Sequence, residues 1–153
     1  MALSVRRLRP GDEAVLALLA REDADFDLED RGKPIAPLSP EAARTFLAEP
    51  GIFACVAEEG GRPVGFLYGH RLLKRAGDPG EALLYEIGVR KAHRRRGVGR
   101  ALVETLFAWM DEQQLGEVWV LADNPGAAAF YRACRFDMEP GSSFHIHRRG
   151  QAR

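Results

Sequence analysis

The sequence predicts an α/β protein in which helices flank a mixed central sheet. Two observations lead to this fold class. Strand-like segments alternate with amphipathic helical segments along the chain, and two strands in the middle are joined by a glycine turn as a hairpin. The 153 residues are 46% hydrophobic, which suits one domain with one core. We therefore expect a single domain over residues 1–153.

Each predicted element follows from local periodicity. Alternating or short apolar runs predict strands at residues 4–8, 52–58, 63–73, 83–89 and 117–121. The run 83–89 is so apolar that it resembles a strand covered on both faces. Apolar stripes and capping residues predict helices at 13–21, from 40 onward, at 97–114 and at 125–135. Residues 144–147 are expected to form a closing strand. An acidic run covers residues 22–30, and Gly32, Pro34, Pro37 and Pro40 predict a loop in the segment that follows it.

Charge and cysteine content exclude several classes of protein. The 22 Lys and Arg balance the 22 Asp and Glu, whereas a nucleic-acid-binding domain is expected to carry a basic excess. Cys55 and Cys134 lie far apart and have no metal-ligand spacing, so we interpret them as buried thiols and expect no metal. The N-terminal residues contain no signal peptide or membrane span, which favours a cytoplasmic location and no membrane partner.

The strand at 83–89 runs into a basic loop and then into the longest predicted helix. Cations are disfavoured at a helix N-terminus, where unpaired N–H groups and the helix dipole attract anions. Glycines at this point let a phosphate approach the backbone closely. A solvated basic loop is the alternative interpretation. The residues concerned are Arg94, Arg95, Arg96, Gly97, Val98, Gly99 and Arg100.

Two motifs resemble those of the GNAT superfamily of acyl-CoA N-acyltransferases. The first is Arg94-x-x-Gly97-x-Gly99, which resembles the superfamily's phosphate-binding signature. The second begins at Asn124 and Ala127 and continues through Phe130-Tyr131 to Arg135-Phe136, where Arg135 stands in place of the usual Gly. This departure puts the local turn in question. The motifs have the order and separation of the family, and the resemblance extends over nearly the whole chain.

The resemblance implies a fold, a co-substrate and a set of binding residues. The fold would be a mostly antiparallel sheet with a splayed cleft between the fourth and fifth strands. The co-substrate would be acetyl-CoA, and a homodimer is the usual assembly. Residues implied to bind the co-substrate are Ile87, Gly88, Val89, Arg94, Arg95, Arg96, Gly97, Val98, Gly99, Arg100, Asn124, Ala127 and Tyr131. Gly88 also predicts a local bulge in its strand.

The chain also resembles one branch of the superfamily, the aminoglycoside 3-N-acetyltransferases. The similar stretches are Tyr85-Glu86-Ile87-Gly88-Val89 leading to His93-Arg94-Arg95-Arg96-Gly97, and Leu121-Ala122-Asp123 leading to Pro125 and Tyr131. This narrower resemblance implies a role in antibiotic resistance, although close relatives within the branch need not act on antibiotics.

Three residues are candidates for the chemistry. Glu86 is the charged residue of the apolar strand 83–89, and a carboxylate can deprotonate an incoming ammonium. The alternatives for Glu86 are a solvent-facing side chain or one that only orients the amine. By family resemblance, the backbone N–H of Val89 would stabilise the oxyanion and Tyr131 would protonate the departing thiolate. A tyrosine packed on its own helix is the alternative for Tyr131.

The acidic run from residue 22 to residue 30 is a candidate for attracting a polycationic substrate. Most such runs are solvated loops, but in this fold the segment borders the acceptor side of the cleft. His145 and His147 share a face of the expected closing strand and have no assigned role. The candidate substrate-binding residues are Glu22, Asp23, Asp25, Asp27, Glu86 and Asp123.

Three functions fit these features. The first is an N-acetyltransferase that acts on a primary amine of a small polycationic molecule. Aminoglycosides are one candidate class of substrate, and the resemblance implies acetylation at their 3-N position. The second is a protein or amino-acid N-acetyltransferase, since a basic peptide would also be attracted. The third is a non-catalytic acyl-CoA-binding sensor, which Glu86 and Tyr131 together argue against. The acceptor amine and the length of the acyl group are not fixed by the sequence.

Overall fold

The computed structural model describes residues 2–26, 35–77, 79–122 and 125–137. These divide into two compact units, Met1–Leu121 and Ala122–Arg153, which are described separately below. A single domain over the whole chain stays a prediction. The expected closing strand at 144–147, with His145 and His147, lies outside the described residues.

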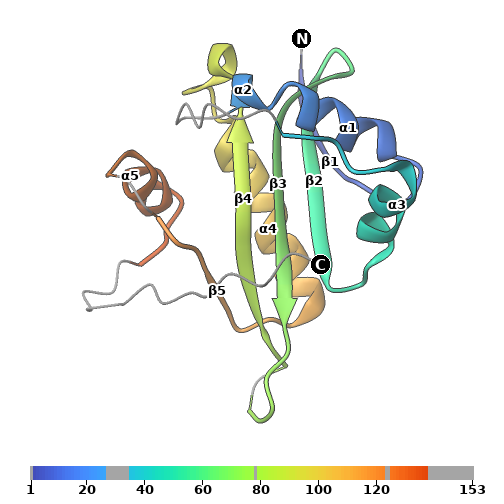
Figure 1. Cartoon of the computed structure of the whole chain (residues 1–153). Coiled ribbons are helices and arrows are strands. Elements are labelled where there is room, and N and C mark those ends of the chain that lie inside the picture. Colours follow the sequence, from blue (N-terminus) through green and yellow to red (C-terminus); the bar gives the residue numbers. More distant parts are fainter. Residues whose placement is uncertain (1, 27–34, 78, 123–124, 138–153) are drawn as a thin grey trace. The chain divides into compact units, whose positions relative to one another are not determined.

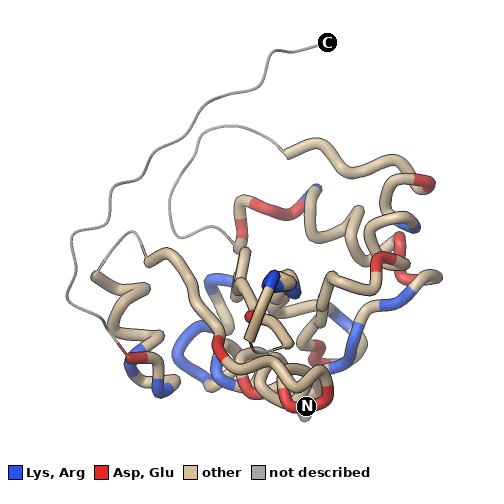
Figure 2. The backbone as a smooth tube through the Cα atoms, turned by 90° about the horizontal axis from the view of Figure 1, so that it is seen from below, with Lys and Arg blue, Asp and Glu red and all other residues tan. Residues whose placement is uncertain are grey.

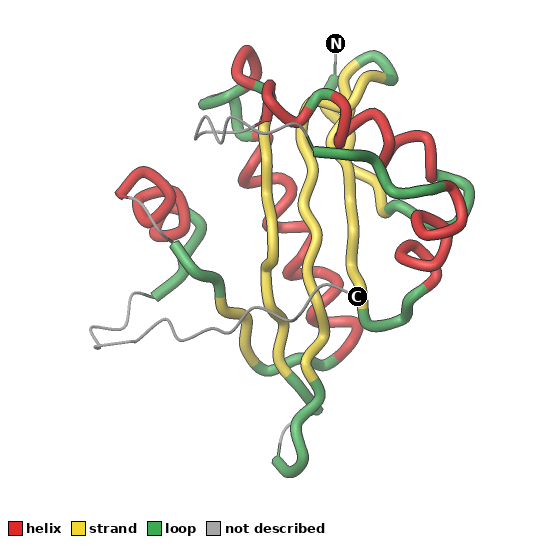
Figure 3. The backbone as a smooth tube through the Cα atoms, in the orientation of Figure 1, coloured by secondary structure: helices red, strands yellow, loops and turns green. Residues whose placement is uncertain are grey.

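The first unit contains a five-stranded sheet with its strands in sequential order (Figure 3). Neighbouring strands are antiparallel from the first to the fourth, and the fifth runs parallel to the fourth. The predicted mixed, mostly antiparallel sheet is thus confirmed. Its strands are β1 (Leu3–Arg7), β2 (Ile52–Glu59), β3 (Arg62–Leu72), β4 (Glu81–Val89) and β5 (Glu117–Trp119).

Helices lie on both faces of this sheet (Figure 1). A Cβ on Gly65 would meet the Val98 and Leu102 side chains of α4, whereas a Cβ on Gly88 would meet Phe26 at the end of α2. Gly65 pairs with Val89, the neighbour of Gly88, so the two glycines face opposite sides of the sheet. The helices of this unit are α1 (Glu13–Arg21), α2 (Asp23–Phe26), α3 (Pro40–Ala48) and α4 (Val98–Gln113).

Local sequence explains where these helices begin. The Ser39 hydroxyl accepts a hydrogen bond from the Ala42 N–H at 3.1 Å, and Pro40 occupies the first turn, which confirms the predicted start of α3. The acidic run, in contrast, is not wholly a loop, because residues 23–26 form the short helix α2. The sequence pattern concealed it, since Phe26 is the single buried side chain of that turn.

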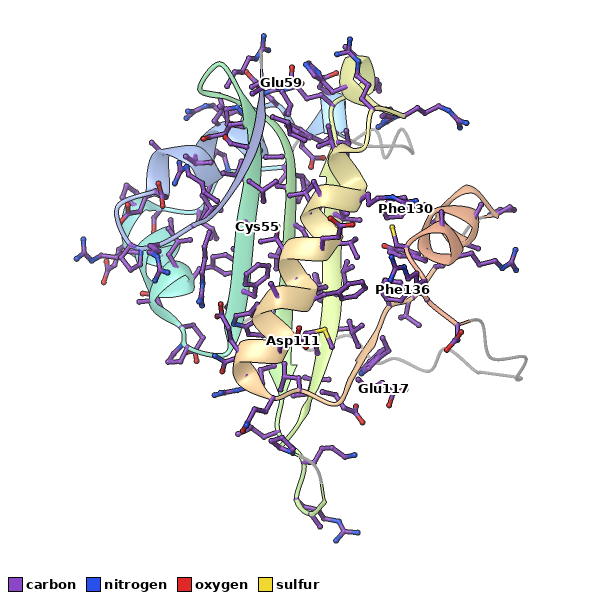
Figure 4. The ribbon with its side chains drawn as sticks, turned by 180° about the vertical axis from the view of Figure 1, so that it is seen from behind. Cys55, Glu59, Asp111, Glu117, Phe130 and Phe136 are labelled. Carbon is purple, nitrogen blue, oxygen red and sulfur yellow. The ribbon has the colours of Figure 1, made fainter. Side chains whose placement is uncertain are left out.

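The longest helix, α4, builds the larger core. Its Leu102, Leu106 and Trp109 are at most 2% exposed, and the Trp109 ring stacks on Phe53 of β2 with 5.1 Å between ring centroids. Figure 4 shows Cys55 on β2 in the view where α4 crosses in front of the sheet. Burial raises the pKa of the Cys55 thiol to about 12. The prediction that both cysteines are buried free thiols is confirmed.

The second unit contains α5 (Pro125–Ala133), which begins at the predicted proline. Its C-terminal turn resolves the question raised by Arg135. The Phe136 N–H donates to the Tyr131 carbonyl at 2.9 Å, and the Arg135 N–H donates to the Arg132 carbonyl at 3.0 Å. This is the Schellman arrangement, which needs a left-handed residue, and Arg135 supplies it with φ +71°. The turn that usually contains glycine is therefore formed without it.

Both signs of charge occur throughout the described backbone. Figure 2 shows basic and acidic positions interspersed around the tube, in keeping with equal numbers of both in the sequence. A helix of the length and hydrophobicity that a bilayer span requires is not found among the described residues. Within the same residues, no three side chains of the metal-binding types gather into a possible metal site.

Candidate active site

A β-bulge in β4 shapes the candidate site. Tyr68 of β3 pairs with Glu86, but its neighbour Gly69 pairs with Leu84, so Tyr85 is the extra residue on β4. A bulge reverses the alternation of side chains at one point, and it therefore brings Tyr85 and Glu86 to the same face. The sequence placed the expected bulge at Gly88, which was wrong by three residues.

Gly69 makes this bulge possible. A Cβ at Gly69 would lie 2.5 Å from the Leu83 carbonyl oxygen, closer than such atoms approach in real proteins. Only glycine lets the two strands come this near to each other. The glycine that allows the bulge thus lies on β3, whereas the extra residue lies on β4.

The face that carries Glu86 also carries a cluster of aromatic rings. The Tyr68 and Tyr85 rings lie 5.3 Å apart, and the His70 ring lies 5.5 Å from Tyr85 and 6.0 Å from Tyr68. Phe46 of α3 packs edge-on against Tyr68 at 5.5 Å. Tyr85 is 62% exposed, so the expectation of a strand covered on both faces is wrong here.

Tyr68 is the immediate partner of Glu86. Burial raises the pKa of the Tyr68 phenol well above its usual value, and the negative charge of Glu86 and the hydrogen bond to it raise it further. The phenol therefore stays protonated at neutral pH and donates its hydrogen to the Glu86 carboxylate. This hydrogen bond fixes the carboxylate at the bulge, while the Glu86 side chain remains half-buried.

Beyond the first residues of β4, the sheet is splayed. Within the described residues, β5 pairs with β4 only from Glu81 to Leu83, and β5 ends at Trp119. The rest of β4 pairs with β3 on one side and with no described strand on the other. This is the splay between the fourth and fifth strands that the resemblance implied.

The pairing with β3 determines which backbone groups of β4 face the splay. The Arg90 N–H donates to the Val64 carbonyl at 2.9 Å, which makes this a hydrogen-bonded pair. Hydrogen-bonded and non-hydrogen-bonded pairs alternate along antiparallel strands. The backbone groups of Val89 and Ile87 therefore face away from β3, whereas those of Gly88 face β3. Of the three residues expected to pair with the co-substrate through their backbone, Ile87 and Val89 have the suitable orientation and Gly88 does not.

Gly88 has a packing role instead. A Cβ there would lie 2.6 Å from the Phe66 ring and 3.1 Å from the Phe26 Cβ. Its absence allows Phe26 of α2 to pack over the strand, edge-on to Phe66 with 5.5 Å between centroids. Gly88 thus holds α2 close to the end of β4.

Arg90, which follows β4, anchors α2. It is 3% exposed, its Nε donates to the Pro63 carbonyl, and its guanidinium lies 4.6 Å from the centre of the Phe26 ring. The same guanidinium forms ion pairs with Glu22 and, at 3.0 Å, with Asp25. These two carboxylates neutralise a buried arginine, and their expected role in attracting a substrate stays a prediction. Asp27 and Asp123 lie outside the described residues.

Arg94 also has structural partners. Its Nε donates to the Val89 carbonyl at 3.1 Å and its Nη2 donates to the Phe26 carbonyl at 3.2 Å. The peptide between Val89 and Arg90 is therefore held at its N–H by Val64 and at its carbonyl by Arg94. The Arg94 side chain joins α2 to β4, although sequence motifs placed it at the phosphate.

The start of α4 has the features of an anion-binding site. Gly97 occupies the cap position in a left-handed conformation with φ +84°, provides no capping side chain, and leaves open space where a Cβ would be. The first turn contains no acidic residue. Arg95, Arg96 and Arg100 are exposed around it. A pyrophosphate would meet backbone N–H groups, the positive end of the helix dipole and exposed arginine side chains here.

Residues 17–136 match the sequence profile described as the acetyltransferase (GNAT) family. The chain belongs to this family. It is 34% identical over 137 residues to a mycothiol acetyltransferase of Clavibacter michiganensis subsp. michiganensis (strain NCPPB 382), a match that covers 89% of this chain and 41% of that protein. The chain thus spans about two fifths of the length of that curated relative.

Solved structures of GNAT proteins share the fold over nearly the whole chain. One aminoglycoside acetyltransferase from an uncultured soil metagenomic sample is 29% identical, with a TM-score of 0.80 over 96% of this chain and 99% of the other. A second one, also from uncultured soil and solved in complex with sisomicin, is 22% identical, with a TM-score of 0.80 over 96% and 97% of the two chains.

The second GNAT motif lies in the other unit. Tyr131 is 6% exposed, and its ring contacts Phe130 and Phe136, each with 5.2 Å between centroids. Figure 4 labels these two phenylalanines on and after α5. Ala127 lies on the same helix, and Asn124 lies outside the described residues. The expected roles of Tyr131, Ala127 and Asn124 stay predictions.

Sequence reasoning missed Tyr68, His70 and Arg90. Tyr68 and His70 alternate along β3, a pattern that indicates a shared face but not what lies opposite them. Arg90 directly follows an apolar strand, and an acidic run elsewhere in the chain was a signal that such a cation has partners. Tyr85 carried no assigned role, because its placement beside Glu86 depends on the bulge.

Proposed function

We propose that this GNAT protein transfers the acetyl group of acetyl-CoA to a primary amine of a small polycationic molecule. The single observation that carries the proposal is the position of Glu86. It stands on a bulge, held by the Tyr68 hydroxyl. Beyond Leu83 the far edge of its strand pairs with no described strand, and the strand leads to the glycine-capped start of α4.

Acetyl-CoA is the first substrate. The N–H groups at Gly97 to Gly99 would hold its pyrophosphate, with Arg95, Arg96 and Arg100 around it. The pantetheine arm would lie along the open edge of β4 and pair with the backbone of Ile87, as an added strand does. In this position the thioester carbonyl would reach the Val89 N–H, which faces the same edge.

The acceptor arrives as an ammonium and must lose a proton before it can attack. An alkylammonium has a pKa near about 10, so a base is needed at neutral pH. Glu86 takes this proton and passes it to solvent. The neutral nitrogen then attacks the thioester carbon, and the Val89 N–H stabilises the oxyanion. The C–S bond breaks, an amide forms, and the thiolate takes a proton from an acid, for which the family resemblance implies the Tyr131 phenol. This acid regains its proton from the second proton that the amine loses.

The substrate class rests on weaker support than the reaction. The structural relatives include aminoglycoside acetyltransferases, one of them solved with sisomicin, and the curated relative is a mycothiol acetyltransferase. Asp23 of α2 and Glu86 are the described acidic residues that we assign to the acceptor side. An aminoglycoside acceptor, the 3-N position and a homodimer are parts of this proposal.

Release of the CoA thiol against a panel of acceptors tests the proposal. The panel contains aminoglycosides, linear diamines, amino acids and a basic peptide with a free N-terminus. Because burial keeps Cys55 protonated, this thiol does not compete for the detection reagent. We expect turnover on aminoglycosides or diamines, and mass spectrometry of the product gives the acetylated position.

The other outcomes separate the alternatives. Turnover confined to the peptide would assign the protein to protein acetylation, and turnover confined to amino acids would assign it to amino-acid acetylation. Tight CoA binding without turnover on any acceptor would identify a sensor. Each of these results would overturn the proposed substrate class.

A further inference from the structure

The aromatic cluster beside Glu86 has a feature that the core does not require. Tyr68 packs against Phe46 and is partly buried, but Tyr85 keeps 62% of its surface exposed. Large exposed aromatic side chains that gather on one face mark binding surfaces more often than isolated ones do. Tyr85 therefore needs an explanation beyond packing.

The register extends this surface onto the neighbouring strand. Leu83 pairs with His70 of β3 on one side and with Trp119 of β5 on the other, so these side chains share the face that carries Tyr85. Trp119 is 40% exposed. The face around the bulge thus presents two exposed rings, one from β4 and one from β5, next to a carboxylate.

Ring faces of tyrosine and tryptophan attract cations, because the π-system is negative above its plane. The reacting amine cannot be the cation held there, since it must become neutral at Glu86. A ring would stabilise the charged form and oppose this deprotonation. The rings therefore suit a second ammonium group, one that stays protonated while the first reacts.

We propose that Tyr85, supported by Tyr68 and His70, forms a subsite for a second ammonium group of the acceptor, so that the enzyme selects diamines and polyamines over monoamines. The inference deepens the proposed function and rests on it. The Tyr68 ring, 5.3 Å away and tilted by 30°, and the His70 ring at 5.5 Å hold the Tyr85 ring in place, while 62% of Tyr85 stays exposed.

The test compares a linear diamine with the monoamine of the same chain length. In the Tyr85→Leu variant, we expect the KM for the diamine to rise about 5- to 20-fold with kcat changed less than about twofold, and the KM for the monoamine to rise less. Tyr85→Phe keeps the ring and is expected to retain the wild-type KM for the diamine. Leu73→Ala, at an exposed leucine next to the end of β3, controls for loss of surface hydrophobicity.

Two results would overturn the subsite. One is an equal rise in KM for both amines in Tyr85→Leu, and the other is no rise at all. Equal urea midpoints of the variants and the wild type exclude misfolding as the cause. Calorimetric titration of the diamine into the CoA-loaded protein gives a second readout. If Tyr85→Leu weakens diamine binding, the subsite is supported even when no acetyl transfer is detected. Absence of transfer in that case would overturn the proposed function and not the subsite.

Discussion

The Tyr68 hydroxyl donates a hydrogen bond to the Glu86 carboxylate across the paired strands β3 and β4. The register of the two strands shifts directly after Tyr68. Tyr68 therefore lies beside the bulge and also holds the Glu86 carboxylate through its hydroxyl. A carboxylate held in this way is the base that we propose.

Replacement of Glu86 by glutamine is expected to reduce kcat by roughly 10²- to 10⁴-fold, the usual contribution of a general base. Glutamine has the same shape and can still accept the Tyr68 hydrogen bond, so CoA affinity and the urea midpoint should stay at wild-type values. Steady-state kinetics with a saturating amine measures the effect. Wild-type kcat in Glu86→Gln would show that the residue only orients the substrate.

Tyr68 gives a prediction for alkaline pH. Its folded pKa is raised above its unfolded value, so its contribution to stability is fully present below pH ~10 and is lost as the pH rises through the folded pKa. The stability difference between the wild type and Tyr68→Phe should therefore shrink between about pH 8 and about pH 11. Urea unfolding at both pH values measures it. A difference that grows with pH would contradict the raised pKa.

Gly69→Ala tests whether the bulge positions Glu86. The new Cβ would press on the Leu83 carbonyl, so the strands must separate or change register, at a loss of about 1–3 kcal/mol in the free energy of unfolding. In the variant that still folds, we expect kcat to fall at least about tenfold because Glu86 moves. Gly51→Ala is the matched control, since its nearest neighbour would be 3.8 Å away. An unchanged kcat in Gly69→Ala would show that catalysis does not depend on the bulge.

Arg94 and Arg95 should behave differently although they are adjacent. Arg94→Ala removes two hydrogen bonds to backbone carbonyls and is expected to reduce stability by about 1–3 kcal/mol. Arg95 is exposed, so Arg95→Ala should leave stability nearly unchanged and weaken CoA binding in a salt-dependent manner. Thermal unfolding and CoA titration at two salt concentrations measure both properties. If Arg94→Ala instead weakened CoA binding without loss of stability, Arg94 would belong to the phosphate site.

Arg135→Gly is expected to stabilise the protein by about 1 kcal/mol. The residue has φ +71°, a conformation that strains any side chain with a Cβ and that glycine adopts freely. Arg132→Gly, one turn earlier inside α5, should destabilise by about the same amount, because glycine is unfavourable within a helix. Urea midpoints distinguish the two. A destabilised Arg135→Gly would show that the arginine makes contacts that outweigh its strain.

Much of the fold could be predicted from sequence, because its signals are local. The Ser39-Pro40 start of α3, the glycine-led start of α4 and the hairpin between β2 and β3 depend on residues close together in the chain. The position of the bulge could not be predicted. Gly69 on β3 allows the bulge, whereas the extra residue, Tyr85, lies on β4. Only the pairing register of the two strands shows that these residues are related.

The candidate site shows the same division. Glu86 and Gly97 stood out because each breaks a local pattern, a charge in an apolar strand and a glycine at a helix start. The roles of Arg90, Arg94, Glu22 and Asp25 could not be read from the sequence. Their ion pairs and hydrogen bonds join α2 to β4 across more than sixty residues of intervening chain.

The most direct measurement is calorimetric titration of acetyl-CoA into the folded wild-type protein and into Gly97→Glu, with Gly97→Ala as the control for backbone strain. We predict saturable binding to the wild type, at least about tenfold weaker binding to Gly97→Glu, and a smaller loss in Gly97→Ala. Absence of binding to the folded wild type, or equal affinity in Gly97→Glu, would contradict the placement of the pyrophosphate at the start of α4 and the acetyl transfer that depends on it.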